Sequence, residues 1–184
     1  MKTYSKLTIE KYLNELAAKT PVPGGGSAAA LLGAIGCALC EMVLNYSHGR
    51  KASRMLAAVK NNRIMFTGLI DKDARVYARL LASIKKYGRD NYKTQSAFKM
   101  AALTPLEICD RSYEAAAAIS GLPSIANRNL MSDVGCAAAA NKACFKAARL
   151  NVEINLKYIN DKNFVNSKRK KLIWLSKRIR QWQR

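Results

Sequence analysis

The sequence is poor in the residues that hold metal ions and close covalent cross-links. His48 is the only histidine, and among the five cysteines only Cys37 and Cys40 form a C-x-x-C pair. The sequence has no second pair of metal ligands at a spacing typical of zinc sites, which argues against a metal centre. Two thiols three residues apart share one helix face, so packing in the core is favoured over a redox or metal role. Free thiols fit a reducing compartment, and we expect a cytoplasmic protein.

Proline and strand-forming residues are also scarce. Four prolines occur, β-branched residues are sparse, and alanine recurs throughout. Alanine is the strongest helix former, so the sequence predicts an all-α, single-domain bundle of about six to eight helices. Helical spacing and end signals place helices at about 8–18, 26–47, 50–87, 92–119, 132–161 and 166–183. Segment 50–87 fits one long helix or two, and Pro105 is expected to bend or break the fourth.

No long, strongly hydrophobic run is present. The most apolar stretch, residues 28–44, contains Glu41 and consists largely of alanine and glycine. It is short and weakly hydrophobic for a membrane span, so a helix buried in a core or between subunits is favoured. The polar opening "MKTYSKLTIEKY" lacks the apolar centre of a secretory signal.

Three adjacent glycines stand directly before this apolar helix. The segment from Pro23 through Gly24, Gly25 and Gly26 to Ser27 is followed by "AAALLGAIGCALCEMV". A helix N-terminus exposes unpaired N–H groups with partial positive charge, and glycine lets a ligand approach that backbone. An ordinary turn needs fewer glycines, so we favour a ligand-binding loop. It is not a P-loop, because no lysine follows at the required position.

Four ordered segments carry a family resemblance. They are "LAAKTPVPGGGSAAALLGAIGCALCEMV", "LIDKDARVYARL", "AALTPLEICDRSYEAA" and "ANRNLMSDVGCAAAANKACFKAARLNVEINLKYIND", which together span about residues 7–161. The sequence resembles the cyclodeaminase/cyclohydrolase family, whose members act on one-carbon derivatives of tetrahydrofolate. Two features depart from that family: Ala126-Asn127 stands where Gly-Asn is usual, and the chain ends in a strongly basic segment.

The resemblance implies an all-helical homodimer that holds its folate substrate, without a metal, in a cleft near the glycine loop. The reaction would be hydrolysis of methenyltetrahydrofolate or cyclisation of formiminotetrahydrofolate with loss of ammonia. Both reactions pass through a tetrahedral carbon and move protons, so a positioned carboxylate could serve either. The alternative is a non-catalytic binding protein on the same scaffold, which holds nucleic acid or an acidic partner through its basic surface.

By resemblance, the catalytic carboxylates are Asp73 and Asp133, which we expect to share one cleft, with both subunits as possible contributors. Asn127, Asn129 and Ser132 join the residues 23–27 as ligand-binding candidates. From the residues alone, the favoured interpretations are a helix N-cap for Asp133, a solvated helix face for Asp73 and turn formation for the two asparagines.

Two further features of the helices bear on the site. Asp71 stands about 200° around its helix from Asp73, so the two cannot line one pocket. Asn151 and Asn155 lie one turn apart and are expected near the site or at the dimer interface.

Acidic residues are few: 12 against 32 lysines and arginines, a formal charge of +20. Residues 167–184 contain eight basic residues and no acid, with Leu172, Leu175, Ile179 and Trp182 at helical spacing. We therefore divide the chain into a helical domain, 1–165, and a basic amphipathic C-terminal helix, 166–184. Docking of this helix on the body is favoured over binding to nucleic acid or an anionic membrane. A basic surface would also attract the polyanionic tail of a polyglutamylated folate.

Overall fold

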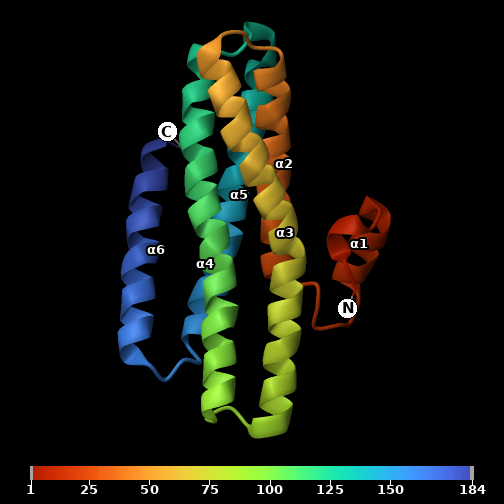
Figure 1. Ribbon diagram of the computed structural model, residues 1–184, viewed down its shortest axis with the longest axis vertical. Helices are drawn as coiled ribbons and strands as arrows, with labels where there is room; N and C mark the ends of the chain where they lie inside the picture. Colours follow the sequence, from red (N-terminus) through yellow and green to blue (C-terminus); the bar gives the residue numbers. More distant parts are fainter. Residues whose placement is uncertain (1, 183–184) are drawn as a thin grey trace.

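The computed structural model describes residues 2–182, which form six α-helices and three one-turn 3-10 helices, with no strand among them. Four helices make a bundle: α2 (Gly25–Asn45), α3 (Arg50–Tyr87), α4 (Tyr92–Gly121) and α5 (Met131–Leu156). Two more flank it, α1 (Ile9–Ala17) beside α3 and α6 (Lys162–Trp182) beside α4 (Figure 1). The short helices are η1 (Tyr4–Lys6), η2 (Leu122–Ser124) and η3 (Arg128–Leu130). The all-α prediction is confirmed.

Local signals set most of the helix ends. Thr8 caps α1 by accepting a hydrogen bond from the backbone N–H of Lys11, and Gly88, at φ +77°, ends α3. Segment 50–87 is one continuous helix, and α4 runs through Pro105 without a break. The predicted end of α5 near residue 161 is wrong. Asp161 instead opens α6, because its carboxylate accepts from the backbone N–H of Phe164 at 2.9 Å.

The core forms where α2 packs against α3 and α5. Small residues on α2 let the neighbouring helices approach closely: the buried ring of Phe66 covers Gly33, and the Ala137 carbonyl of α5 lies beside Gly36. Cys37 and Cys40 are both buried here, as their spacing predicted. By length and composition α2 is apolar enough to cross a membrane, but a core helix passes the same test, and half of its most apolar window is buried in this bundle.

Unequal helix lengths open one end of the bundle. At 1.5 Å per residue, the 38 residues of α3 extend about 57 Å and the 21 residues of α2 only about 32 Å. Helices α3 and α4 therefore continue beyond the point where α2 begins (Figure 1). The N-terminus of α2, with its glycines, faces the space between the remaining helices.

The basic C-terminal helix docks on the body. Leu172, Leu175 and Ile179 of α6 are all buried, and α6 packs mainly against α4. The fourth residue of the predicted apolar stripe, Trp182, closes α6, but its side chain falls outside the described part of the chain. The docking prediction is confirmed for the three described residues. The helix begins at Lys162, four residues before the position expected.

Candidate functional site

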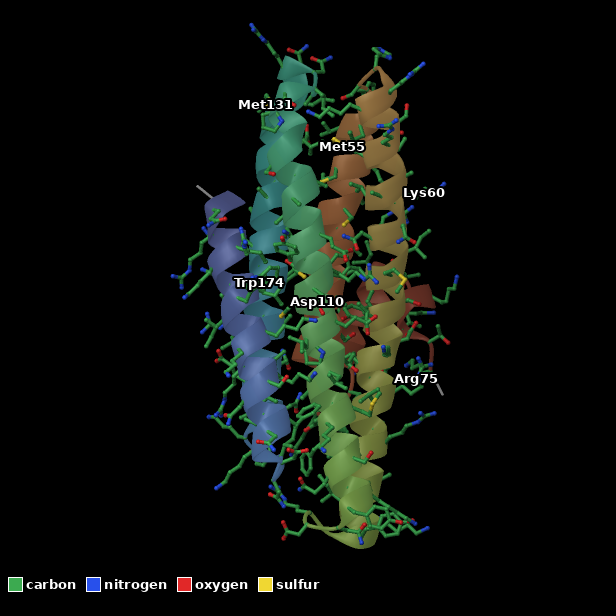
Figure 2. All side chains as sticks on the ribbon, turned by 60° about the vertical axis from the view of Figure 1, so that its left-hand side comes forward. Met55, Lys60, Arg75, Asp110, Met131 and Trp174 are labelled. Atoms are coloured by element: carbon green, nitrogen blue, oxygen red, sulfur yellow. The ribbon has the colours of Figure 1, made fainter. Side chains whose placement is uncertain are left out.

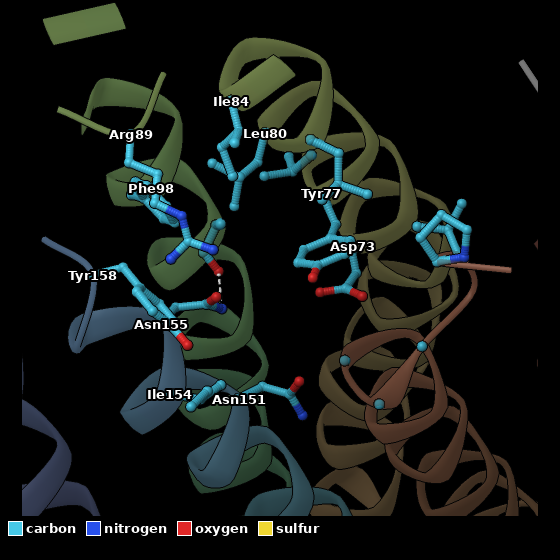
Figure 3. A pocket seen from close by; sticks show the side chains of 18 residues that line it. Asp73, Tyr77, Leu80, Ile84, Arg89, Phe98, Asn151, Ile154, Asn155 and Tyr158 are labelled. Carbon is cyan, nitrogen blue, oxygen red and sulfur yellow. Dashed lines mark hydrogen bonds between the residues drawn. The ribbon is translucent and has the colours of Figure 1, made fainter. Parts of the chain in front are cut away.

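A cavity of about 390 Å³ lies at the open end of the bundle. The N-terminus of α2, the second half of α3, the start of α4 and the end of α5 surround it (Figure 3). Its polar and aromatic lining includes Asp73, Tyr77, Arg89, Phe98, Asn151, Asn155 and Tyr158. This combination of apolar walls and a few polar groups is typical of a small-molecule site.

Gly24, Gly25 and Gly26 form one wall of this cavity, and the adjacent side chains explain why glycines are needed. A Cβ atom on Gly26 would overlap the carboxylate of Asp73, and one on Gly25 would lie 3.1 Å from Asn151 Nδ2. The missing side chains thus let a carboxylate from α3 and an amide from α5 approach the first turn of α2. The glycines bring two functional groups together, in addition to any room that they leave for a ligand.

Asp73 supplies a carboxyl group to the cavity. Burial raises its pKa to about 6, and a hydrogen bond from the backbone N–H of Ser27 opposes part of this rise. The Ser27 hydroxyl faces away from the cavity, 3.0 Å from the buried Tyr12 hydroxyl. Ser27 therefore supports Asp73 through its backbone N–H, and its side chain does not reach the ligand site that the sequence predicted for it. A carboxyl group with this pKa can take up or release a proton near neutral pH.

Pro105 and Asn155 are linked through a backbone carbonyl. In a regular helix the Ala101 carbonyl would accept from the N–H of residue 105, but proline has no N–H. Asn155 Nδ2 donates to this carbonyl instead, at 2.8 Å (Figure 3). The amide is thereby fixed, and its oxygen has no donor among the described residues. Pro105 does not break α4; it frees the carbonyl that orients a cavity residue.

Asn151 is oriented in a similar way. Its Nδ2 donates to the Ala147 carbonyl within α5 at 2.9 Å, which leaves its carboxamide oxygen toward the cavity. The two asparagines, which the sequence could place either at the site or at an interface, thus both line the cavity. Together they present two hydrogen-bond acceptors to a ligand.

An aromatic wall stands opposite Asp73. The rings of Phe98 and Tyr158 stack with centroids 5.6 Å apart, and the Arg89 guanidinium lies 5.3 Å from the Tyr158 centroid. Arg89 projects from the α3–α4 connection toward the opening (Figure 3). The wall offers a flat apolar surface and one cation, which fits a ligand with both aromatic and anionic parts.

The second predicted carboxylate lies elsewhere in the chain. Asp133 is in the first turn of α5, which starts at the opposite end of the bundle, where Met131 is seen in Figure 2. Eighteen residues separate it from Asn151, about 27 Å along the helix axis. Within one chain, Asp73 and Asp133 do not share a cleft. Asp133 lies at the start of α5, whereas the cavity around Asp73 is lined by residues at the end of α5. A joint role would require a second copy of the chain.

The other candidates divide between the two ends. Asn127, Asn129 and Ser132 lie near Asp133, and the Asn127 side chain accepts from the Asn129 backbone N–H, as a turn former does. Asp133 is not an N-cap, since Leu130 holds that position.

Pro23 is buried next to the glycines but does not line the cavity, whereas Pro21 and Val22 do. Asp71 points away, as predicted, and accepts from the backbone N–H groups of Tyr4 and Ser5.

Four of the polar and aromatic cavity residues were not predicted from sequence: Tyr77, Arg89, Phe98 and Tyr158. Tyr77 stands one helical turn after Asp73, so its direction could have been found by extending the helical count used for Asp71. Nothing in the local sequence marks Arg89, Phe98 or Tyr158, because they meet only after α3, α4 and α5 have packed.

The helical bundle holds an ionisable carboxyl group in a partly apolar cavity. These features are typical of a protein that binds a small molecule and can transfer protons to or from it. Comparison with known proteins narrows this class. The profile described as Formiminotransferase-cyclodeaminase matches residues 8–173, and the chain belongs to this family.

Individual relatives agree with that membership. The chain is 31% identical to the methenyltetrahydrofolate cyclohydrolase of Methylorubrum extorquens, over 90% of this chain and 86% of that protein. It is 29% identical to the formimidoyltransferase-cyclodeaminase of Rattus norvegicus, over 90% of this chain but 33% of that protein. Among solved structures, the formiminotetrahydrofolate cyclodeaminase of Thermotoga maritima is similar, with a TM-score of 0.91 and 28% identity, covering 97% of this chain and 92% of that chain.

Proposed function

We propose that this protein is a folate one-carbon enzyme that acts at the bridge between N5 and N10 of tetrahydrofolate. It hydrolyses methenyltetrahydrofolate to the N10-formyl form or cyclises formiminotetrahydrofolate with release of ammonia. The observation that carries the proposal is the Asp73 carboxyl group, with its pKa of about 6, at the N-terminus of α2 inside the cavity. The relatives named for these two activities support it.

The two reactions share the methenyl ring, as substrate of one and product of the other, and both need a group that transfers protons. In hydrolysis, water adds to the bridging carbon, a base takes its proton, and the bond to N5 breaks as N5 is protonated. In cyclisation, N10 attacks the formimino carbon and the departing nitrogen must receive a proton. Asp73 is the candidate for these transfers, since a carboxyl group with a pKa near the working pH can both accept and return a proton.

The cavity also suits the parts of a folate. The stacked Phe98 and Tyr158 offer a surface for a flat ring, and the oriented oxygens of Asn151 and Asn155 accept hydrogen bonds from ring N–H groups. Arg89 offers a cation for the glutamate carboxylates, which also applies to a polyglutamylated substrate.

The decisive experiment mixes the purified protein with methenyltetrahydrofolate and follows loss of its absorbance. In parallel, formiminotetrahydrofolate is added and both methenyl formation and ammonia are measured. One of the two conversions is expected, and Asp73→Asn is the matched inactive control. Binding of folate without either conversion would favour a non-catalytic protein on this scaffold.

We also propose that the protein is a homodimer in which α2 faces the partner. Leu31, Ile35, Ala38 and Met42 recur along one face of α2, and Ile35 remains 45% exposed in the single chain. An exposed apolar helix face favours burial against a second copy. Sedimentation should give a dimer at micromolar concentration, and Ile35→Glu should give a folded monomer. A wild-type monomer would refute the proposal.

A further inference from the structure

A basic groove runs between α5 and α6, apart from the folate cavity. It consists of two cavities of about 380 and 500 Å³ that share Arg149, Ser176 and Arg180 in their linings. Neither shares a lining residue with the cavity around Asp73. The groove exists because α6 packs mainly on α4 and touches α5 only lightly.

The rim of this groove is almost entirely cationic. It carries seven basic residues and one acid, Glu153, which pairs with Arg149 at 2.8 Å. The other six have no ion pair among residues 2–182; they are Lys142, Lys146, Lys157, Arg169, Lys177 and Arg180. So many like charges side by side repel one another, and an anionic ligand would relieve this repulsion.

The cations form two rows of useful length. Lys142 to Lys157 extend about 22 Å along α5, and Arg169 to Arg180 about 16 Å along α6. Between them lies an apolar floor that includes Phe145, Leu172 and Ile179. An extended polyanion fits two such rows better than a single compact anion does, because many separated charges can then be neutralised at once.

We propose that this groove binds the phosphate backbone of a nucleic acid. Two of its cations, Lys177 and Arg180, lie beyond residue 173, where the family match ends. A second copy of the chain would bring the same positive charge to the same groove, which disfavours a symmetric contact there.

A membrane is the less favoured occupant. An amphipathic helix binds a bilayer by inserting its apolar face. In α6 that face is already used, since Leu172, Leu175 and Ile179 are buried against the body. Trp174, which is exposed on α6, packs against Tyr113 with Arg178 over its ring. Ile173 and Trp174 remain exposed on α6, but the stripe of Leu172, Leu175 and Ile179 is not free to insert into a bilayer, whereas the cations remain free to contact phosphates.

The test estimates the number of phosphate contacts from the salt dependence of the binding constant. Fluorescence anisotropy is measured with a labelled oligouridylate of about 20 nucleotides and with duplex DNA of about the same length, between about 50 and 200 mM salt. Each cation removed from a phosphate contact reduces the magnitude of the negative slope of log K against log salt by about 0.7 for a single strand and about 0.9 for duplex DNA. Comparison of the two probes identifies the preferred form.

The variant is Lys142→Gln with Lys146→Gln. Its matched control is Arg54→Gln with Lys60→Gln, two exposed cations on α3, where Lys60 lies far from Trp174 of α6 (Figure 2). The groove variant should reduce the magnitude of the slope by about 1.4 with RNA or about 1.8 with DNA and weaken binding about tenfold. The control should change neither, and both should keep wild-type folate turnover.

Three results would overturn the proposal: equal losses in variant and control, absence of binding to both nucleic acids at about 50 mM salt, or equally tight binding to polyglutamate or to phosphatidylserine vesicles. The first would indicate attraction to the whole basic surface, and the last would assign the groove to another anionic partner. Since none of these readouts uses folate, a failure here is distinguishable from a failure of the proposed enzyme activity.

Discussion

At the scale of single residues, the burial of Asp73 gives it a pKa suited to proton transfer but lowers the stability of the folded protein at neutral pH. Its pKa is raised from the ordinary 3.8 to about 6 by burial. Between these pH values the folded state binds more protons than the unfolded state, so the free energy of unfolding falls as pH rises through this window. The stabilising effect of the proton is complete below about pH 4 and lost above about pH 6.

Asp73→Asn should therefore separate activity from stability. Turnover is expected to fall about 100-fold or more, because the acid–base group is gone. The free energy of unfolding at pH 7 should rise by about 1 to 3 kcal/mol, and this gain should shrink toward pH 4, where wild-type Asp73 is protonated. Denaturant titrations at the two pH values measure the difference.

Asp71→Asn is the matched control, two residues away. Asp71 accepts hydrogen bonds from Tyr4 and Ser5, which hold η1 against α3. Its replacement should lower stability and leave turnover within a few fold. If both variants lost activity equally, the assignment of the catalytic role to Asp73 would be contradicted.

At the scale of helices, the proline of α4 should act on the ligand through Asn155. In Pro105→Ala, the new N–H of residue 105 would compete for the Ala101 carbonyl and release the Asn155 amide. The KM for folate should rise about 5- to 10-fold with little change in kcat. Asn155→Ala should have a similar effect, and the double variant should be no worse than either. Additive losses in this double-mutant cycle would show that the two residues act separately.

The close contact between α2 and α3 depends on Gly33. A Cβ there would lie 2.5 Å from Phe66 Cε1, in a fully buried position. Gly33→Ala should lower the free energy of unfolding by about 1 to 3 kcal/mol through overpacking. Gly68→Ala is the control, since a Cβ on Gly68 would meet nothing within 4 Å, and it should stabilise α3 by up to about 1 kcal/mol. Equal thermal shifts in both variants would contradict this account.

The docking of α6 can be tested with two positions on opposite faces. Leu175 is 1% exposed and Ile173 is 56% exposed. Leu175→Ala should lower the free energy of unfolding by about 2 to 5 kcal/mol, whereas Ile173→Ala should change it by no more than about 0.5 kcal/mol. Thermal or denaturant melts compare them, and a harmless Leu175→Ala would mean that α6 adds nothing to the fold.

At the scale of the whole molecule, the order of the helices could be predicted because most of their boundaries have a local cause. Thr8 and Gly88 act on their own neighbours, so they could be recognised without knowing the fold. The site could be predicted only in part. Asp73 and the glycines were found, but the separation of Asp133 depends on how far α5 runs, and Phe98 reaches the cavity only through packing between helices.

The unequal length of α2 and α3 has a consequence for hydrogen exchange. Where α2 is absent, the ends of α3 and α4 have fewer neighbours, so their amides should open more often than those in the complete part of the bundle. A bound folate would occupy the place of the missing helix turns and join the three remaining helices. Amide protons of residues 76–84 and 98–101 should then exchange more slowly with ligand present, although no new secondary structure forms.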